Sequence, residues 1–300
     1  MATQEKTHKD VYSIITEKII QQLEHGTVPW RKPWHDGGIP TNLISKRPYR
    51  GINVMLLAMA GYEHNLFLTS KQLKELGGSI KPEEKPHLVV YWNYVDRKNT
   101  DSTDSDEGQE DTKSNKKAML RYYTVFNVAQ CDGIPEKLIP KIPHISHPES
   151  TCKLIVNGMP NKPRIQHKEQ RAYYDPLKDY VNMPKQTSFT SDEAYYSTLF
   201  HELVHSTGHH SRLHRQGLIE MAEFGSTPYS HEELVAEIGS CYLQSHAGIQ
   251  GEFEQSVAYI QGWLKVLKED RKCIFSASTA AQKAVDYILD IQAGTDEKEE

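Results

Sequence analysis

The segment FHELVHSTGHH, residues 200–210, contains residue types that can bind and use a metal ion. His201 and His205 are four residues apart, so in a helix both imidazoles project from one face and can bind the same ion. Glu202 follows the first histidine, where its carboxylate can take a proton from a metal-bound water. This is the His-Glu-x-x-His pattern of zinc hydrolases. We therefore predict a metal centre with His201 and His205 as ligands and Glu202 as the catalytic acid/base.

The third ligand is not expected within the same segment. One large clan of zinc proteases has a third histidine three residues after a glycine. In this chain Gly208 is that glycine, but Ser211 occupies the ligand position. His209 and His210 are out of register and are expected to lie in solvent beside the helix end, with Gly208 as the helix stop.

The segment SHEELVAEIGSCYLQSH, residues 230–246, can supply the missing carboxylate. Glu233 and Glu237 are one helical turn apart, as in gluzincins, where one acid binds zinc and the other orients a ligand histidine. We predict Glu233 as the ligand and Glu237 as the orienting acid; the reverse assignment fits the same spacing. Tyr229 is a candidate hydroxyl donor to an oxyanion, although a packing role fits it as well. The expected ion is Zn²⁺, with Mn²⁺ as the alternative.

The segment from Thr27 to Arg50 is basic and aromatic, with five basic residues against one acid. Cations that contact phosphates, placed beside rings that stack on unpaired bases, are typical of single-strand DNA binders. Because the chain has no base-reading helix or zinc-finger pattern, binding is expected to be independent of base sequence. The same composition fits a small domain with two core tryptophans and a solvated basic rim. The residues predicted to contact DNA are Trp30, Arg31, Lys32, Trp34, Lys46, Arg47, Tyr49 and Arg50.

The whole chain has the composition of a soluble globular protein. It has 300 residues, 37% of them hydrophobic and 25% charged, with a net charge of −5, which argues against a uniformly basic nucleic-acid coat. The N-terminus is too polar for a signal peptide and no apolar run is long enough for a membrane span. We expect a cytoplasmic protein. The four cysteines are far apart and indicate neither disulfides nor a cysteine zinc site.

The elements that position these residues form an α+β pattern, with few strands followed by several helices. Apolar periodicity and capping residues predict the elements. The predicted helices are 11–23, closed by Gly26, then 52–60 and 70–76, and later 192–207, 230–246, 253–268 and 276–291. Strands are predicted at 87–95 and 120–128, and short strands and turns at 151–184.

An acidic segment separates the two longer strands. From Asp101 to Asp111 there are six acids, no base and no large apolar residue, so it is expected to be a mobile loop between paired strands. The predicted organisation is an N-terminal domain at 1–135, with the mobile loop near 97–117, and a proline-rich linker at 136–150. A mostly helical domain at 151–292 and a charged tail at 293–300 follow.

The order of these motifs resembles a known family. The segments IITEKIIQQLEHGTVPWRKPW, NLISKRPYRGINVMLL, LTSKQLKELGGSI and YYTVFNVAQ are similar to the N-terminal domain of plasmid antirestriction proteins of the ArdC type, which also precedes some conjugative primases. The segments AYYDP, FHELVHSTGHHSRLHR and EELVAEIGS are similar to the zincin-like domain of the same proteins. The resemblance implies a single-stranded DNA-binding α+β domain joined to a gluzincin-type metallopeptidase domain. Carried over to this chain, it implies His201, His205 and a carboxylate from EELVAE as zinc ligands, and Glu202 as the acid/base.

The resemblance also implies that the protein protects incoming plasmid DNA from host restriction during conjugation. The expected partners are single-stranded DNA and an unknown protein substrate. Double-stranded DNA or components of the restriction enzyme are further candidates, and no membrane partner is expected. The alternative hypothesis is a binding module whose metal site is structural or vestigial. A metal-dependent nuclease is less favoured, because two-metal nucleases use clustered acids and this pattern offers one His-His-Glu site.

Overall fold

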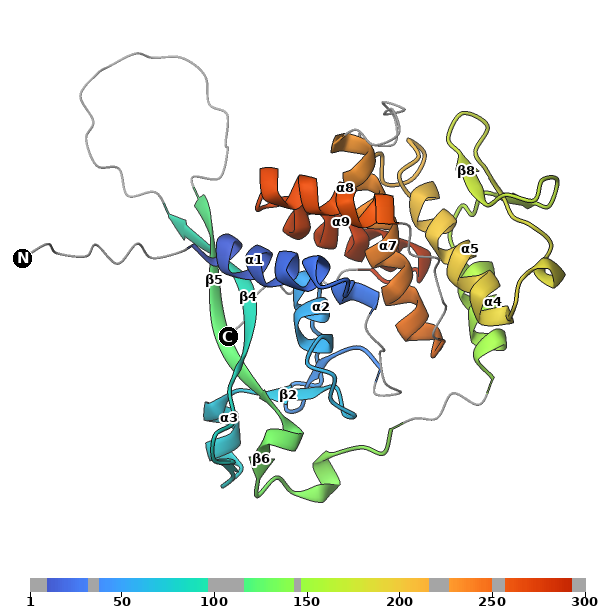
Figure 1. Ribbon diagram of the computed structural model, residues 1–300. Helices are drawn as coiled ribbons and strands as arrows, with labels where there is room; N and C mark the ends of the chain where they lie inside the picture. The colour runs from blue at the N-terminus through green and yellow to red at the C-terminus, as the bar shows by residue number, and fades with distance from the viewer. Residues whose placement is uncertain are drawn as a thin grey trace, which may run out of the picture.

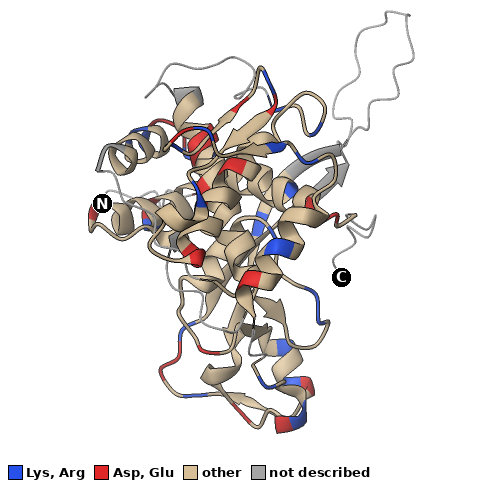
Figure 2. Ribbon diagram, turned by 90° about the vertical axis from the view of Figure 1, so that its right-hand side faces the viewer, with Lys and Arg blue, Asp and Glu red and all other residues tan. Residues whose placement is uncertain are grey.

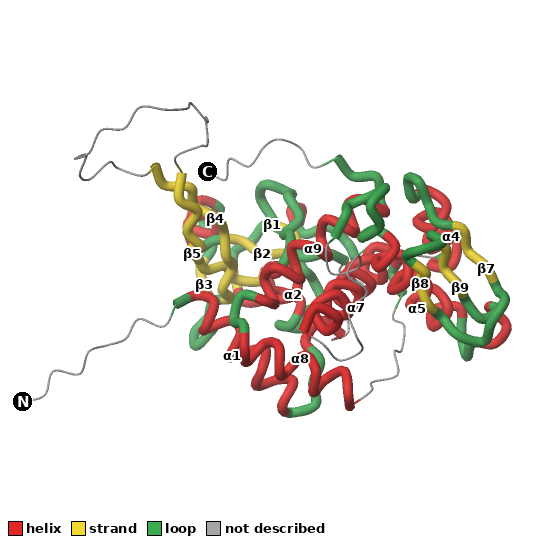
Figure 3. The backbone as a smooth tube through the Cα atoms, turned by 90° about the horizontal axis from the view of Figure 1, so that it is seen from above, coloured by secondary structure: helices red, strands yellow, loops and turns green. Residues whose placement is uncertain are grey.

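The computed structural model describes residues 10–31, 38–96, 116–142, 147–215, 227–249 and 257–292. Its α-helices are α1 (Val11–Glu24), α2 (Ile52–Ala58), α3 (Ser70–Glu75), α4 (Pro148–Gly158), α5 (Asp192–Ser206), α7 (Thr227–Ala247), α8 (Val257–Glu269) and α9 (Cys273–Ile288). Short 3-10 turns are η1 (Pro29–Arg31), η2 (Val128–Gln130), η3 (Glu136–Leu138) and η4 (Gln186–Ser188). The predicted α+β class is confirmed, and Figure 3 shows the helices between two separate groups of strands.

The strands form three small sheets. They are β1 (Thr41–Asn42), β2 (Leu66–Leu68), β3 (Ser79–Ile80), β4 (His87–Asp96), β5 (Lys116–Asn127), β6 (Cys131–Asp132), β7 (Arg164–Gln166), β8 (Tyr173–Asp175) and β9 (Tyr180–Asn182). The sheet orders are β1-β2-β5-β4, β3-β6 and β7-β9-β8. In the last of these, β7 is parallel to β9 and β8 is antiparallel to it, which makes β8 an edge strand beside α5.

The longest strands, β4 and β5, form an antiparallel ribbon that runs from the pair His87 and Val125 to the pair Asp96 and Lys116. The prediction that the acidic segment connects two paired strands is therefore confirmed. Its own residues, 97–115, lie outside the described part of the chain.

Local sequence signals determine several helix ends. The side chain of Asp10 accepts a hydrogen bond from the Ser13 N–H at 2.8 Å and starts α1. Thr69 and Gln72 form a capping box that starts α3. Gly26 adopts a left-handed φ of 73° two residues after α1 ends. The prediction of short strands and turns at 151–184 is confirmed for β7, β8 and β9 but is wrong for its first residues, which belong to α4 and bury Cys152, Ile155 and Val156.

One hydrophobic core joins the N-terminal and C-terminal regions. It includes Ile15 and Ile19 of α1 and Met55 of α2, together with side chains of α4, α5, α7, α8 and α9. Figure 1 shows α1 and α2 next to the orange and red helices. The predicted linker at 136–150 thus separates the two regions along the chain, but their helices share a core. Part of that linker, residues 143–146, lies outside the described residues.

Charged residues of both signs are interspersed along the fold, as Figure 2 shows. Any contact with DNA phosphates therefore has to come from a local group of cations. Among the described residues, no helix has the length and apolar character needed to cross a membrane.

Helices α5 and α7 approach each other closely because α7 carries small residues where they cross. A Cβ atom added to Gly239 would lie 2.9 Å from Cγ2 of Val204 in α5. One residue on, the Ser240 hydroxyl donates a hydrogen bond to the carbonyl of Ser197 at 3.0 Å. This approach brings the residues of the two helices into one site.

We expect Gly239→Ala to lower the free energy of unfolding by up to about 2 kcal/mol. Overpacking costs about 1 to 3 kcal/mol, and the better helix propensity of alanine offsets about 1 kcal/mol of that. Gly262→Ala in α8 is the matched control, because its added Cβ would meet only the Ser230 hydroxyl, at 3.4 Å. The control should be neutral or stabilising. Equal shifts of the melting temperature in both variants would contradict the predicted contact.

Candidate metal centre

His201, His205 and Glu233 form a compact triangle of ligand atoms. The Nε2 atoms of the two histidines are 3.1 Å apart. The carboxylate oxygens of Glu233 lie 3.5 Å from His201 Nε2 and 3.4 Å from His205 Nε2. Ligands about 2.1 Å from a tetrahedral metal ion are about 3.4 Å from one another. The geometry and the donor set, two imidazoles and a carboxylate, therefore fit a divalent cation.

Two helices bring the triangle together. In α5, Leu199, Phe200 and Leu203 are buried in the core, and the two histidines on the neighbouring face are directed towards α7. The hydroxyl of Ser191 caps the start of α5 by accepting a hydrogen bond from the Ala194 N–H at 3.1 Å. The third ligand atom comes from α7, as the sequence spacing predicted for Glu233.

Glu202 is buried next to this triangle but does not belong to it. Burial raises the pKa of its carboxyl above the ordinary value, and the nearby His201 and His205 act in the opposite direction. The backbone N–H of Tyr174 in β8 donates a hydrogen bond to the carboxylate. A buried carboxyl group that is held in a fixed orientation beside a metal site is suited to accept and return a proton.

Glu232, and not Glu237, orients the second histidine. Its Oε1 lies 3.3 Å from Nδ1 of His205, on the side of the ring that faces away from the triangle. Burial acts to raise the pKa of Glu232, but hydrogen bonds from His205 and Arg215 lower it to about 2. Glu237 was predicted to orient one of the ligand histidines, and for His205 this contact comes from Glu232, because successive residues on a helix point about 100° apart and Glu232 points at the end of α5. Glu237 is buried one turn further along α7.

Two arginines that the sequence reasoning missed hold the end of α5. Arg215 donates to Glu232 at 2.6 Å, to the Thr207 hydroxyl at 2.6 Å and to the Val204 carbonyl at 2.8 Å. Arg212 donates to the Ser206 carbonyl at 2.7 Å and forms an ion pair with Asp179. Basic residues just after a helix are a general signal for such contacts with its last carbonyls.

The carboxylates also set the protonation of the ligand histidine. Burial acts to lower the pKa of His205, but Glu233 and Glu232 outweigh it and raise the pKa to about 10. Metal ligands have to be deprotonated, so binding of an ion at this site competes with a proton on His205.

Tyr229 lies next to the triangle, from the first turn of α7. Its hydroxyl is hydrogen-bonded with Tyr259 and Glu233, and burial, followed by the charge of Glu233, raises its pKa. Its position is compatible with the predicted hydroxyl donor. The rings of His209 and His210, by contrast, lie against each other at a tilt beyond the end of α5, and neither residue belongs to the triangle.

Three of the residues predicted to contact DNA make contacts within the protein instead. Trp30 is 0% exposed, in η1, so the prediction that it stacks on bases is wrong for this fold. Arg50 is partly exposed and forms an ion pair with Asp286 of α9. Tyr49 packs against Phe67 in the N-terminal sheet.

Lys46 and Arg47 are exposed, in the turn after β1. Lys32 and Trp34 lie outside the described residues, as does the side chain of Arg31.

The β4–β5 ribbon exposes two aromatic side chains that the sequence reasoning assigned only to strands. Trp92 is 48% exposed and Tyr122 is 53% exposed. Trp92 lies opposite Leu120 and Tyr122 opposite Val90, two residues along, so both rings are on the same face of the ribbon. Exposed rings of this kind can stack on unpaired bases.

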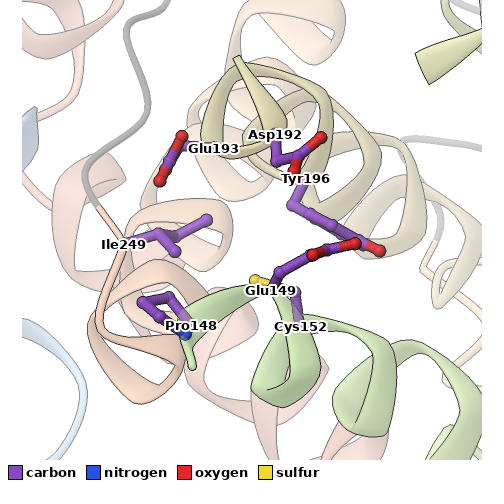
Figure 4. Close-up of a pocket in the computed structure, with 7 residues that line it drawn as sticks. All are labelled: Pro148, Glu149, Cys152, Asp192, Glu193, Tyr196 and Ile249. Atoms are coloured by element: carbon purple, nitrogen blue, oxygen red, sulfur yellow. The ribbon is translucent and has the colours of Figure 1, made fainter. Parts of the chain in front are cut away.

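A small pocket lies apart from the metal centre, where the first turns of α4 and α5 meet (Figure 4). It has a volume of about 150 Å³ and is lined by Pro148, Glu149, Cys152, Asp192, Glu193, Tyr196 and Ile249. Burial, assisted by the charge of Glu193, raises the pKa of the Cys152 thiol to about 12. This thiol is therefore protonated at neutral pH and is unsuited to act as a nucleophile.

The His-Glu-x-x-His helix and the glutamate from α7 are the parts of a zincin-like metallopeptidase domain, and the family so described matches residues 159–280. The family described as the N-terminal domain of anti-restriction factor ArdC matches residues 9–126. The chain belongs to the ArdC family of antirestriction proteins.

Solved structures agree with this assignment. The fold is similar to the crystal structure of antirestriction protein ArdC from plasmid R388, with 37% identity. The metal-free form has a TM-score of 0.75 over 94% of this chain and 97% of that chain. The Mn(II)-bound form has a TM-score of 0.74 over 94% and 98%.

Two curated relatives cover nearly the same part of this chain. The uncharacterized protein y4eC of Sinorhizobium fredii (strain NBRC 101917 / NGR234) is 34% identical over 94% of this chain and 92% of its own length. The DNA primase TraC of Escherichia coli is 33% identical over 94% of this chain, which corresponds to 27% of the primase.

Proposed function

We propose that this protein binds single-stranded DNA without sequence specificity, protects incoming plasmid DNA from host restriction during conjugation, and carries a working metallopeptidase site. The observation that carries the proposal is the triangle of His201, His205 and Glu233 with the buried Glu202 beside it. A purely structural metal site would not require a general base with a raised pKa at that position. The membership in the ArdC family supports the antirestriction role.

The proposed ion is Zn²⁺ or Mn²⁺. Two imidazoles and a carboxylate suit zinc, and the Mn(II)-bound form of the R388 protein supports manganese as a second occupant. An ion bound here would polarise a peptide carbonyl and lower the pKa of a water molecule.

The protein supplies the proton transfers and the orientation of the site. Glu202 accepts the proton of the attacking water and returns it to the leaving amine, a role that its raised pKa favours. Glu232 and Arg215 fix the ring of His205. We also propose Tyr229 as a hydrogen-bond donor to the oxyanion that develops on the substrate.

We propose that DNA binds to the exposed cations Lys46 and Arg47 and to the exposed rings Trp92 and Tyr122. The cations contact phosphates, and the rings stack on bases. The proposal leaves out Trp30, which is buried, and Arg50, which is paired with Asp286.

Replacing Lys46 and Arg47 together by alanine is expected to weaken binding to oligo-dT and to make it less salt-dependent. Each lost phosphate contact lowers the slope of log K against log salt by about 0.7. Arg164 and Lys168, exposed cations on the other side of the molecule, provide the matched double variant. Fluorescence anisotropy at several salt concentrations measures both. Equal slopes for the two double variants would place the DNA elsewhere.

The function as a whole is tested by conjugation into restricting and non-restricting recipients. A plasmid that expresses this chain should enter the restricting recipient more efficiently than one that lacks it. No difference in the non-restricting recipient is expected. Equal transfer of both plasmids into the restricting recipient would refute the antirestriction role.

A further inference from the structure

A continuous row of aromatic side chains connects the N-terminal region with the metal centre. Trp30 of η1 packs edge-on against Trp263 of α8, with ring centroids 5.1 Å apart and an angle of 72°. Trp263 in turn stacks on Tyr259, one helical turn earlier, at 6.0 Å and 28°. Both tryptophans are almost completely buried. Interlocked rings of this kind cannot move independently in a close-packed core.

The row ends at a ligand of the metal centre. The hydroxyl of Tyr259 is hydrogen-bonded with that of Tyr229, and Tyr229 is hydrogen-bonded with Glu233. The hydroxyl of Tyr259 is also close enough to Glu233, Glu237 and Glu202 to be affected by their charges. Tyr259 therefore borders the site from α8, a helix that contributes no ligand to the triangle.

The position of α8 depends on the N-terminal region. Apart from its contacts with α7 and α9, it packs against α1, and Trp263 packs against η1. The buried hydroxyl of Thr16 in α1 donates a hydrogen bond at 2.7 Å to the carbonyl of Arg271, just after α8. The indole nitrogens of Trp30 and Trp263 have no hydrogen-bond partner among the described residues, so packing alone fixes these two rings.

We propose that Tyr259 is a positioning residue of the metal centre, which holds Tyr229 against Glu233, and that Trp30 keeps Tyr259 in place through Trp263. The N-terminal region then sets the affinity of a metal site to which it contributes no ligand. The inference rests on the metal centre but not on peptidase activity or DNA binding. Partners that orient metal ligands in this way typically change metal affinity about 10- to 100-fold.

A double-mutant cycle on the full chain, with Mn²⁺ as the titrant in calorimetry, tests this arrangement. Tyr259→Phe keeps the ring and removes the hydroxyl, and it should weaken Mn²⁺ binding by about 10-fold or more. Trp30→Ala should weaken binding by about 3- to 10-fold when Tyr259 is present. In the Tyr259→Phe background, the same Trp30→Ala change should alter the affinity by less than about 2-fold.

Two further variants separate positioning from general damage to the fold. Trp30→Phe preserves an aromatic contact with Trp263 and should restore most of the Mn²⁺ affinity that Trp30→Ala loses. If Trp30→Ala does not fold, Trp263→Phe takes its place in the cycle. Leu154→Ala, which removes an exposed apolar side chain of α4, should leave the affinity unchanged.

Three results would contradict this proposal. Equal losses from Trp30→Ala in both backgrounds would overturn the connection between Trp30 and Tyr259. A change of less than about 2-fold in Tyr259→Phe would overturn the role of Tyr259 itself. If the unmodified chain binds neither Mn²⁺ nor Zn²⁺, the metal centre is wrong, and this inference fails together with it.

Discussion

Replacing Glu202 by glutamine is expected to slow hydrolysis of a susceptible protein by about 100- to 10,000-fold, the usual contribution of a general acid/base. Glutamine keeps the volume of the buried side chain and can still accept the hydrogen bond from the Tyr174 N–H through its carbonyl oxygen. It cannot accept a proton from water. Because Glu202 is outside the ligand triangle, the affinity for Mn²⁺ should change little.

Glu193→Gln is the matched control for this experiment. It makes the same chemical change on the same helix, about two and a half turns before Glu202, and should leave hydrolysis intact. Time courses of substrate cleavage and Mn²⁺ titrations measure the two effects. Equal cleavage rates for both variants would remove Glu202 from the mechanism.

The Glu202→Gln variant also distinguishes protection by proteolysis from protection by DNA binding alone. If proteolysis is the means of protection, Glu202→Gln should lose protection in the conjugation assay while it retains affinity for oligo-dT. Full protection by Glu202→Gln would instead support the binding module, in which the metal stabilises the fold and DNA binding alone protects the plasmid.

Changing the acids of α7 one at a time is expected to give a graded loss of metal affinity. Glu233→Gln removes a ligand atom of the triangle and should weaken Mn²⁺ binding by more than the 10- to 100-fold typical of residues that only orient a ligand. Glu232→Gln leaves the triangle intact but weakens the contact with His205 Nδ1, so a loss within that 10- to 100-fold range is expected.

Glu237→Gln provides the control within this series, since it removes the same charge from the same helix one turn from Glu233. It should reduce Mn²⁺ affinity less than either of the other two variants. Calorimetric titration of the three proteins gives the ranking directly. A loss in Glu237→Gln as large as that in Glu233→Gln would identify Glu237 as the third ligand and contradict the geometry of the site.

Local sequence signals predicted the part of the site that lies within single helices. The predicted helix 192–207 and the observed α5, Asp192–Ser206, differ by one residue, because a serine cap and an apolar stripe define it. The relative placement of His201, Glu202 and His205 follows from the pitch of that helix alone.

The errors concern residues whose surroundings come from distant parts of the chain. Trp30 stands among basic residues in the sequence. A segment of this composition fits a ring that stacks on bases as well as a ring that packs in the core. Its partner, Trp263, is more than two hundred residues away in the sequence. The exposed rings Trp92 and Tyr122 were not recognised because an aromatic residue in a strand carries no sign of which face is covered.

The sequence by itself determined the metal-binding residue types, their helices and the family, since these depend on spacing within a turn or two of helix and on the order of motifs. The tertiary structure decided which glutamate completes the triangle, which one orients His205, and that Trp30 packs against the helix beside the metal centre. These choices depend on how α5, α7 and α8 cross. The crossing is set by close contacts, such as that of Gly239 with Val204, between residues far apart along the chain.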